Sequence, residues 1–183
     1  MISINEKLPS FNLNAVVSTD AQNGFQTITD QDFKGQWLVL FAWPKDFTFV
    51  CPTEIQGFGA FDRHFKEANA QLLGLSTDSD FVHLAWRSSN PLLQDSPFPW
   101  LSDIKKDFSN ALGILDQNEG VANRATFIID PERNIRYASI NDMKVGREPK
   151  EILRVLKALQ TDQLTPCSWQ AGEATLEQQE TEA

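Results

Sequence analysis

The fold is decided by the stretch Trp37-Leu38-Val39-Leu40-Phe41-Ala42-Trp43-Pro44-Lys45-Asp46-Phe47-Thr48-Phe49-Val50-Cys51-Pro52-Thr53-Glu54. Its first part, Trp37–Phe41, is continuously apolar, as expected for a strand that is covered on both faces. After Cys51, apolar residues recur at spacings that place them on one face of a helix. They are Ile55, Phe58, Phe61, Phe65 and Ala68. The stretch therefore predicts a buried strand, a connecting segment and a helix that packs on the sheet.

Further strands are indicated on both sides of this stretch. They are predicted at residues 12–17, 71–76, 125–129 and 135–140. The turn-rich segment 130–134 joins the last two strands, so these two should form a hairpin. Strands in this number, interleaved with helices, indicate an α/β protein.

Two more helices are predicted. One starts at Asp78, Ser79 or Asp80 as its cap and contains the apolar residues Phe81, Leu84, Ala85 and Trp86. The other starts near Pro149, a residue suited to a first helical turn. Its buried face should carry Ile152, Leu153, Leu156 and Leu159. The element order predicts a thioredoxin-like fold, with a mixed central sheet flanked by helices.

The length of 183 residues is typical of one domain. We expect a thioredoxin-like domain over residues 1–160 and a C-terminal arm over residues 161–183. The arm has five acidic residues and neither lysine nor arginine, so it should pack loosely or extend to a neighbouring subunit.

The net charge of −9 disfavours nucleic acid and anionic lipid as partners, because both are bound through basic patches. The longest apolar runs are too short to span a membrane. The first residues, Met1–Pro9, lack the basic and apolar regions of a secretory signal, so we expect a cytoplasmic protein. Its two cysteines, Cys51 and Cys167, are then more typical of reactive or incidental thiols than of a structural disulfide.

Cys51 stands where the apolar strand gives way to a helix. In open α/β folds, ligands bind beyond the carboxyl ends of the strands. A cysteine in a first helical turn also meets unpaired backbone N–H groups and the positive end of the helix dipole, and both favour thiolate over thiol. Because the thiolate is the nucleophilic form, Cys51 is the candidate for covalent catalysis.

The residues around Cys51 form a longer motif. Pro44, Thr48 and Cys51 match the pattern Pro-x-x-x-Thr-x-x-Cys, which resembles the active-site motif of the peroxiredoxins. The segment Phe47–Glu54 is similar to the typical two-cysteine class, nearest to its alkyl hydroperoxide reductase C branch, and the resemblance runs from about Pro9 to Gly172. It implies an antioxidant thiol peroxidase that reduces hydrogen peroxide and organic hydroperoxides without a metal or organic cofactor.

The resemblance also implies roles for individual residues. Thr48 would hydrogen-bond the peroxide and Cys51, and Pro44 would shield the thiolate from water. Arg124, at the start of a predicted strand, would activate both thiolate and peroxide, because a nearby cation stabilises each negative charge. Supporting or packing positions are matched by Arg147, Glu54 and Trp86.

The C-terminal segment departs from the usual pattern. Thr165 occupies the position of the usual resolving cysteine, and Cys167 lies two residues before Trp169. Cys167 is therefore the candidate that condenses with a Cys51 sulfenic acid, by resemblance in another subunit of a homodimer, and such dimers would assemble into a ring. A flavoprotein reductase, a disulfide adapter protein or thioredoxin could each reduce the disulfide.

The sequence also bears on other kinds of function. His64 and His83 do not form a zinc ligand pair or a Cys–His hydrolase pattern, and are predicted to be surface or packing residues. A thioredoxin-like disulfide reductase needs Cys-x-x-Cys, but Glu54 occupies the fourth position. An oligomeric chaperone that shields unfolding clients remains open as a second or separate activity.

Overall fold

The computed structural model describes residues 2–181, so Met1 and the end of the predicted arm, including Glu182, lie outside the described residues. The chain divides into two compact units, Met1–Arg147 and Glu148–Ala183. The predicted boundary between residues 160 and 161 stays a prediction. Among the described residues, none of the helices combines the length and apolar character that crossing a membrane requires.

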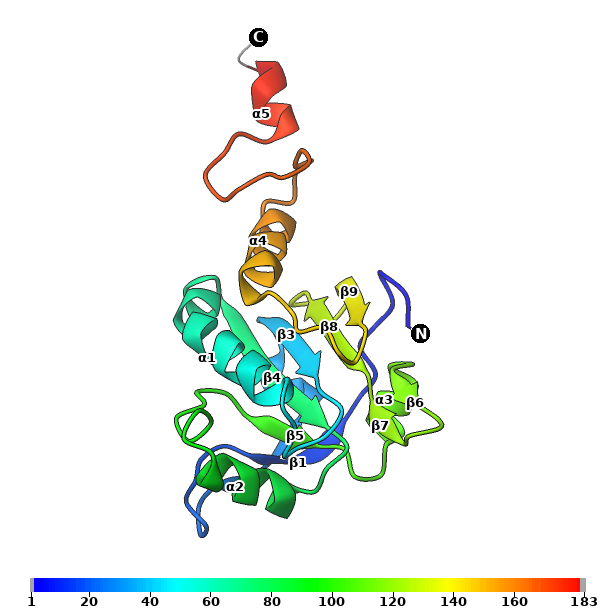
Figure 1. Ribbon diagram of the computed structural model, residues 1–183. Helices are drawn as coiled ribbons and strands as arrows, with labels where there is room; N and C mark the ends of the chain where they lie inside the picture. The colour runs from blue at the N-terminus through cyan, green and yellow to red at the C-terminus, as the bar shows by residue number, and fades with distance from the viewer. Residues whose placement is uncertain (1, 182–183) are drawn as a thin grey trace. The chain divides into compact units, whose positions relative to one another are not determined.

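A seven-stranded sheet forms the centre of the first unit, in the order β2-β1-β5-β4-β3-β8-β9 (Figure 1). The strands are β1 (Asn12–Val16), β2 (Phe25–Thr29), β3 (Trp37–Ala42), β4 (Ala70–Ser76), β5 (Trp100–Ser102), β8 (Arg124–Ile129) and β9 (Ile135–Asn141). The pairs β3–β4 and β4–β5 are parallel, and the other pairs are antiparallel. The sheet is therefore mixed, as predicted. A separate short hairpin pairs β6 (Leu115–Asp116) with β7 (Val121–Ala122).

Helices cover this sheet. They are α1 (Cys51–Glu67), α2 (Asp80–Ser89), α3 (Asp107–Ala111) and the 3-10 helix η1 (Asp30–Phe33). α1 packs along β4, and α2 contacts β1 and β5 (Figure 1). The Ser79 hydroxyl accepts a hydrogen bond from the backbone N–H of Val82 at 3.2 Å, so Ser79 is the cap among the three predicted candidates.

β3 is buried on both faces, as its apolar run predicts. Leu38 and Leu40 belong to a core cluster that includes Phe108 of α3. Phe41 points to the opposite face, because side chains alternate along a strand, and stacks on Phe58 of α1 with ring centroids 4.1 Å apart. α1 is thereby fixed against the strand that leads to it, which determines where the first turn of α1 lies.

The buried face of α2 is partly polar. Phe81 is 71% exposed and Ala85 is also exposed, whereas His83, Trp86 and Arg87 are buried. These three residues have the spacing of one helical face, so the face turned to the sheet carries two polar residues.

The second unit contains α4 (Pro149–Gln160) and α5 (Leu176–Thr181). α4 begins at Pro149 as predicted, with Ile152, Leu153 and Leu156 buried and Leu159 only half-buried. Between the two helices, Trp169 is buried, its indole N–H donates to the carbonyl of Glu173 at 2.9 Å, and its carbonyl accepts from Arg154 at 3.0 Å. Trp169 is therefore packed and hydrogen-bonded, although the composition of the arm predicts loose packing.

Candidate active site

Cys51 is the first residue of α1 and is completely buried. The preceding residue, Val50, caps the helix, and its carbonyl accepts hydrogen bonds from the backbone N–H groups of Thr53 at 3.1 Å and Glu54 at 3.3 Å. Pro52 follows in the first turn, where its missing N–H leaves no intrahelical bond unmade. The Cys51 sulfur thus lies at the positive end of a 17-residue helix, where the helix dipole attracts negative charge.

Arg124 brings a cation to the sulfur. It is the first residue of β8, which pairs with β3, and its guanidinium is buried. Nη1 of Arg124 donates to Sγ of Cys51 at 3.3 Å, and Nε donates to the carbonyl of Met143 at 2.8 Å. Since water does not screen a buried pair, this cation stabilises a Cys51 thiolate more strongly than a surface arginine could.

Glu54, in the first turn of α1, forms ion pairs with two arginines. Its Oε2 accepts from Nη1 of Arg124 at 2.5 Å. Arg147 approaches the same carboxylate in a bidentate manner, with Nε 2.7 Å from Oε1 and Nη2 2.9 Å from Oε2. Its backbone N–H also donates to Oε1 at 3.0 Å. Both oxygens are therefore held by charge-assisted hydrogen bonds, which fix the geometry of the whole network.

The network carries a net positive charge beside the Cys51 sulfur. Arg124 and Arg147 are cations and Glu54 is a carboxylate, so one positive charge remains unbalanced. Because an unbalanced buried charge is costly, negative charge that develops at this site is stabilised by the network.

Arg147 is itself fixed by the core. Its Nη1 donates to the carbonyl of Ala125 at 2.7 Å. The guanidinium lies over the rings of Phe41 and Phe58, 5.4 and 5.8 Å from their centroids. These cation–π contacts connect the ion network to the packing between β3 and α1.

Pro44 and Thr48 lie in the segment that joins β3 to α1. Pro44 is buried and Thr48 is half-buried. The Thr48 hydroxyl donates to the carbonyl of Lys45 at 2.9 Å, so its oxygen lone pairs are available to accept a hydrogen bond. Trp86 of α2 is buried and contacts the ring of Phe47 in this segment, with centroids 5.9 Å apart.

Cys167 lies in the second unit and is exposed. It stands two residues before the buried Trp169, and its Sγ is 3.7 Å from the hydroxyl oxygen of Ser168. The two cysteines thus differ sharply in environment, since Cys51 is buried and accepts a hydrogen bond from Arg124 whereas Cys167 is exposed.

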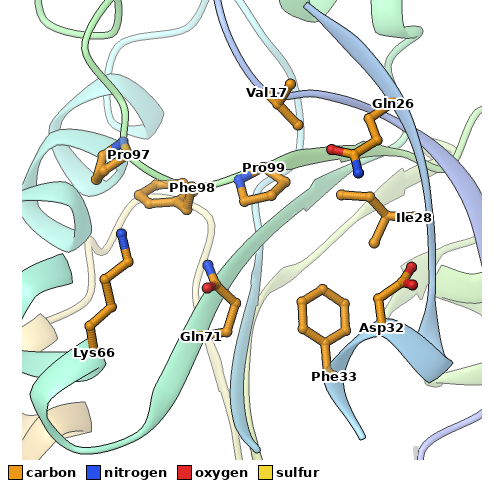
Figure 2. Close-up of a pocket in the computed structure, with 10 residues that line it drawn as sticks. All are labelled: Val17, Gln26, Ile28, Asp32, Phe33, Lys66, Gln71, Pro97, Phe98 and Pro99. Atoms are coloured by element: carbon orange, nitrogen blue, oxygen red, sulfur yellow. The ribbon is translucent and has the colours of Figure 1, made fainter.

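A pocket of about 370 Å³ lies elsewhere in the first unit (Figure 2). Figure 2 shows the side chains of Lys66 and Gln71 extending toward the segment Pro97–Pro99. Lys66 is already paired with Asp62 at 2.7 Å, and neither Cys51 nor Arg124 lines the pocket. Among residues 2–181, no group of three or more His, Cys, Asp or Glu side chains is arranged to hold a metal ion.

Comparison with known proteins agrees with this geometry. Residues 4–138 match the model of the AhpC/TSA family. The chain belongs to this family. An alkyl hydroperoxide reductase C of Mycobacterium tuberculosis is 45% identical, over 97% of this chain and 94% of that protein.

Solved structures of family members have the same fold. Mycobacterium tuberculosis AhpC gives a TM-score of 0.85 at 43% identity, covering 93% of this chain and 99% of that chain. A reduced Plasmodium vivax 2-Cys peroxiredoxin gives 0.87 at 32% identity, covering 95% of this chain and 92% of that chain. The predicted thioredoxin-like fold is thereby confirmed.

The Glu54 carboxylate should be important for the stability of this AhpC/TSA family protein. We expect Glu54→Gln to lower the free energy of unfolding by about 3 kcal/mol or more, because removing one partner of a buried ion pair leaves the other charges uncompensated. Urea denaturation followed by tryptophan fluorescence measures this loss. Glu67→Gln is a matched control on the same helix, since Glu67 forms an exposed pair with Arg63 at 2.9 Å that water screens. Equal losses in the two variants would contradict a structural role for the network.

Proposed function

We propose that this chain is a thiol peroxidase that reduces hydrogen peroxide and organic hydroperoxides with Cys51, in antioxidant defence. The observation that carries the proposal is the completely buried Cys51 sulfur 3.3 Å from Nη1 of Arg124, at the N-terminus of α1. The relatives named alkyl hydroperoxide reductase C and peroxiredoxin support the same reaction.

In the first step, the Cys51 thiolate attacks one peroxide oxygen and an S–O bond forms as the O–O bond breaks. The bonding electron pair leaves with the second oxygen, which takes a proton and departs as water or an alcohol. The Arg124 guanidinium meets the charge that develops on the departing oxygen. Thr48, whose own proton is bonded to Lys45, accepts the hydrogen bond from the peroxide O–H. Pro44, buried at the start of the segment, limits access of water to the sulfur.

In the second step, the Cys51 sulfenic acid condenses with the thiol of Cys167 in another subunit, forming a disulfide and releasing water. A disulfide requires Cα atoms within about 7 Å, so the buried first turn of α1 must open or the arm must move. A flavoprotein reductase, a disulfide adapter protein or thioredoxin then returns both cysteines to thiols. The working unit is a homodimer, assembled into a ring and located in the cytoplasm.

The overall reaction is tested by reconstituting peroxide consumption with each class of reductant in turn. Continuous turnover is expected with at least one of them. If none of them, and no small dithiol, supports consumption of even one equivalent of peroxide, the proposal is wrong.

The intersubunit disulfide gives a separate prediction. Peroxide-treated protein should migrate as a dimer on a non-reducing denaturing gel, because Cys51 of one subunit is joined to Cys167 of the other. Cys167→Ser should stay monomeric on that gel and still consume about one equivalent of peroxide, since Cys51 reacts before resolution.

Two other outcomes would contradict this pairing. A monomeric band without free thiols would mean that the disulfide forms within one subunit. Sustained turnover by Cys167→Ser would mean that an external thiol resolves Cys51 directly.

A chaperone activity is the second candidate, and one observation favours it. Phe47, Phe49 and Phe81 are exposed by 59, 94 and 71%, and apolar side chains of this size can bind unfolding clients. Suppression of client aggregation by Cys51→Ser would separate this activity from peroxide reduction.

A further inference from the structure

A second buried ion pair lies next to the site but outside the Cys51 network. His83 of α2 is completely buried, and Asp46 lies in the segment between β3 and α1 with its side chain 1% exposed. Nδ1 of His83 is 2.6 Å from Oδ2 of Asp46. A contact this short is typical of a charge-assisted hydrogen bond.

Both ring nitrogens of His83 have partners. The second ring nitrogen, Nε2, lies 3.2 Å from the carbonyl oxygen of Leu101 in β5. The other oxygen of Asp46, Oδ1, accepts from the indole N–H of Trp43 at 2.7 Å. The side-chain polar atoms of the pair therefore all lie within hydrogen-bonding distance of a partner, an arrangement that holds one geometry.

The backbone of Asp46 is fixed as well. Its N–H donates to Oδ2 of Asp78 at 2.8 Å, and the N–H of Asp78 donates to the Ser76 hydroxyl at 3.0 Å. Asp46 is thus attached, through side chain and backbone, to residues just after β3 and β4 and to α2, and through His83 to β5. This places a rigid attachment two residues before Thr48.

The residues after Asp46 depend on this attachment. Phe47 has a φ of 55°, a left-handed conformation that a large side chain adopts only when its surroundings impose it. Phe49 is 94% exposed, so packing does little to position this part of the segment. Of residues 46–50, Asp46 is the one that is buried. The backbone conformation that positions Thr48 is therefore imposed mainly at Asp46.

We propose that Asp46 and His83 are positioning residues for peroxide reduction, which fix the segment so that the Thr48 hydroxyl meets the peroxide at Cys51. This inference rests on the proposed function. It separates two properties of the site, because Cys51 is activated by Arg124, Glu54 and α1, whereas the hydrogen bonds of Asp46 and His83 described above go to other residues. Loss of the pair should therefore slow peroxide attack and leave the reactivity of the Cys51 thiolate unchanged.

The test compares two reactions of Cys51 in full-length protein that carries Cys167→Ser, so that Cys51 is the one thiol present. The first is a single turnover with hydrogen peroxide, and the second is alkylation by iodoacetamide, which needs a thiolate but no bound peroxide. We expect His83→Gln to lower the peroxide rate constant about tenfold to a hundredfold, as misplacement of a reacting group by about 1 Å does, and to leave the alkylation rate constant nearly unchanged.

Two further variants sharpen the result. His83→Asn places an amide near the position of Nδ1, from which it can donate to Asp46, so it should restore most of the peroxide rate that His83→Gln loses. His64→Gln is the matched control, because His64 is an exposed histidine in the last turn of α1 that pairs with Glu67, and it should change neither rate constant.

The outcomes are distinguishable. If His83→Gln slows both reactions equally, or slows neither, the positioning role is wrong. The ratio of the two rate constants decides this even if part of the sample is unfolded, since both reactions are measured on the same protein. If the Cys167→Ser parent consumes no peroxide, it is the proposed function that fails.

Discussion

Replacing Cys51 by serine is expected to abolish peroxide reduction. A serine hydroxyl has almost no anionic form at pH 7, so the site would keep its shape and lose its nucleophile. The fold should survive, because serine is no larger than cysteine and Arg124 and Arg147 remain paired with Glu54. Stopped-flow measurement of peroxide loss in the purified variant gives the rate.

Cys167→Ser is the matched control for this experiment. It removes the other thiol, which is exposed, and should keep the first turnover that Cys51→Ser loses. A Cys51→Ser rate above a few per cent of the wild-type rate would place the chemistry at another residue.

Elements with strong local signals could be predicted from the sequence. The apolar run of β3 and the helical spacing after Cys51 each extend over several residues, so each pattern is recognisable even where a single residue does not fit it. β5 was missed because its three residues, Trp100–Ser102, are too few to show a period. β2 was missed because only one of its five residues, Ile28, is buried, so alternation is weak.

The site was predictable only in part, for a related reason. A local motif marks Cys51 and Thr48, and the resemblance to peroxiredoxins selected Arg124. The bridging contacts of Glu54 to two arginines depend on the pairing of β3 with β8, which a sequence does not display. The His83–Asp46 pair joins residues 37 positions apart. The sequence did indicate that His83 is buried, since His83 shares a helical face with Trp86. The burial of a polar residue can be recognised, however, only when its partner is known.

Arg124→Ala is expected to slow peroxide attack by about 10²-fold or more, the effect of losing one preorganised charge-stabilising donor. The physical reason lies in the charges of the network. Without Arg124, Glu54 and Arg147 still form a bidentate pair and neutralise each other. A Cys51 thiolate would then lack a compensating cation, and the departing peroxide oxygen would lack its donor.

This prediction distinguishes Arg124 from a merely structural arginine. Arg124→Ala should slow both peroxide attack and iodoacetamide alkylation of Cys51, because the cation stabilises the thiolate itself. Arg124→Lys should lie between the variant and the wild type, since a lysine keeps the charge but cannot donate from separate nitrogens to Cys51 and to Met143. Arg136→Ala is the matched control, because Arg136 on the neighbouring strand β9 pairs with Asp130 at 3.4 Å. An unchanged second-order rate constant in Arg124→Ala would remove Arg124 from the site and leave the helix N-terminus as the source of Cys51 activation.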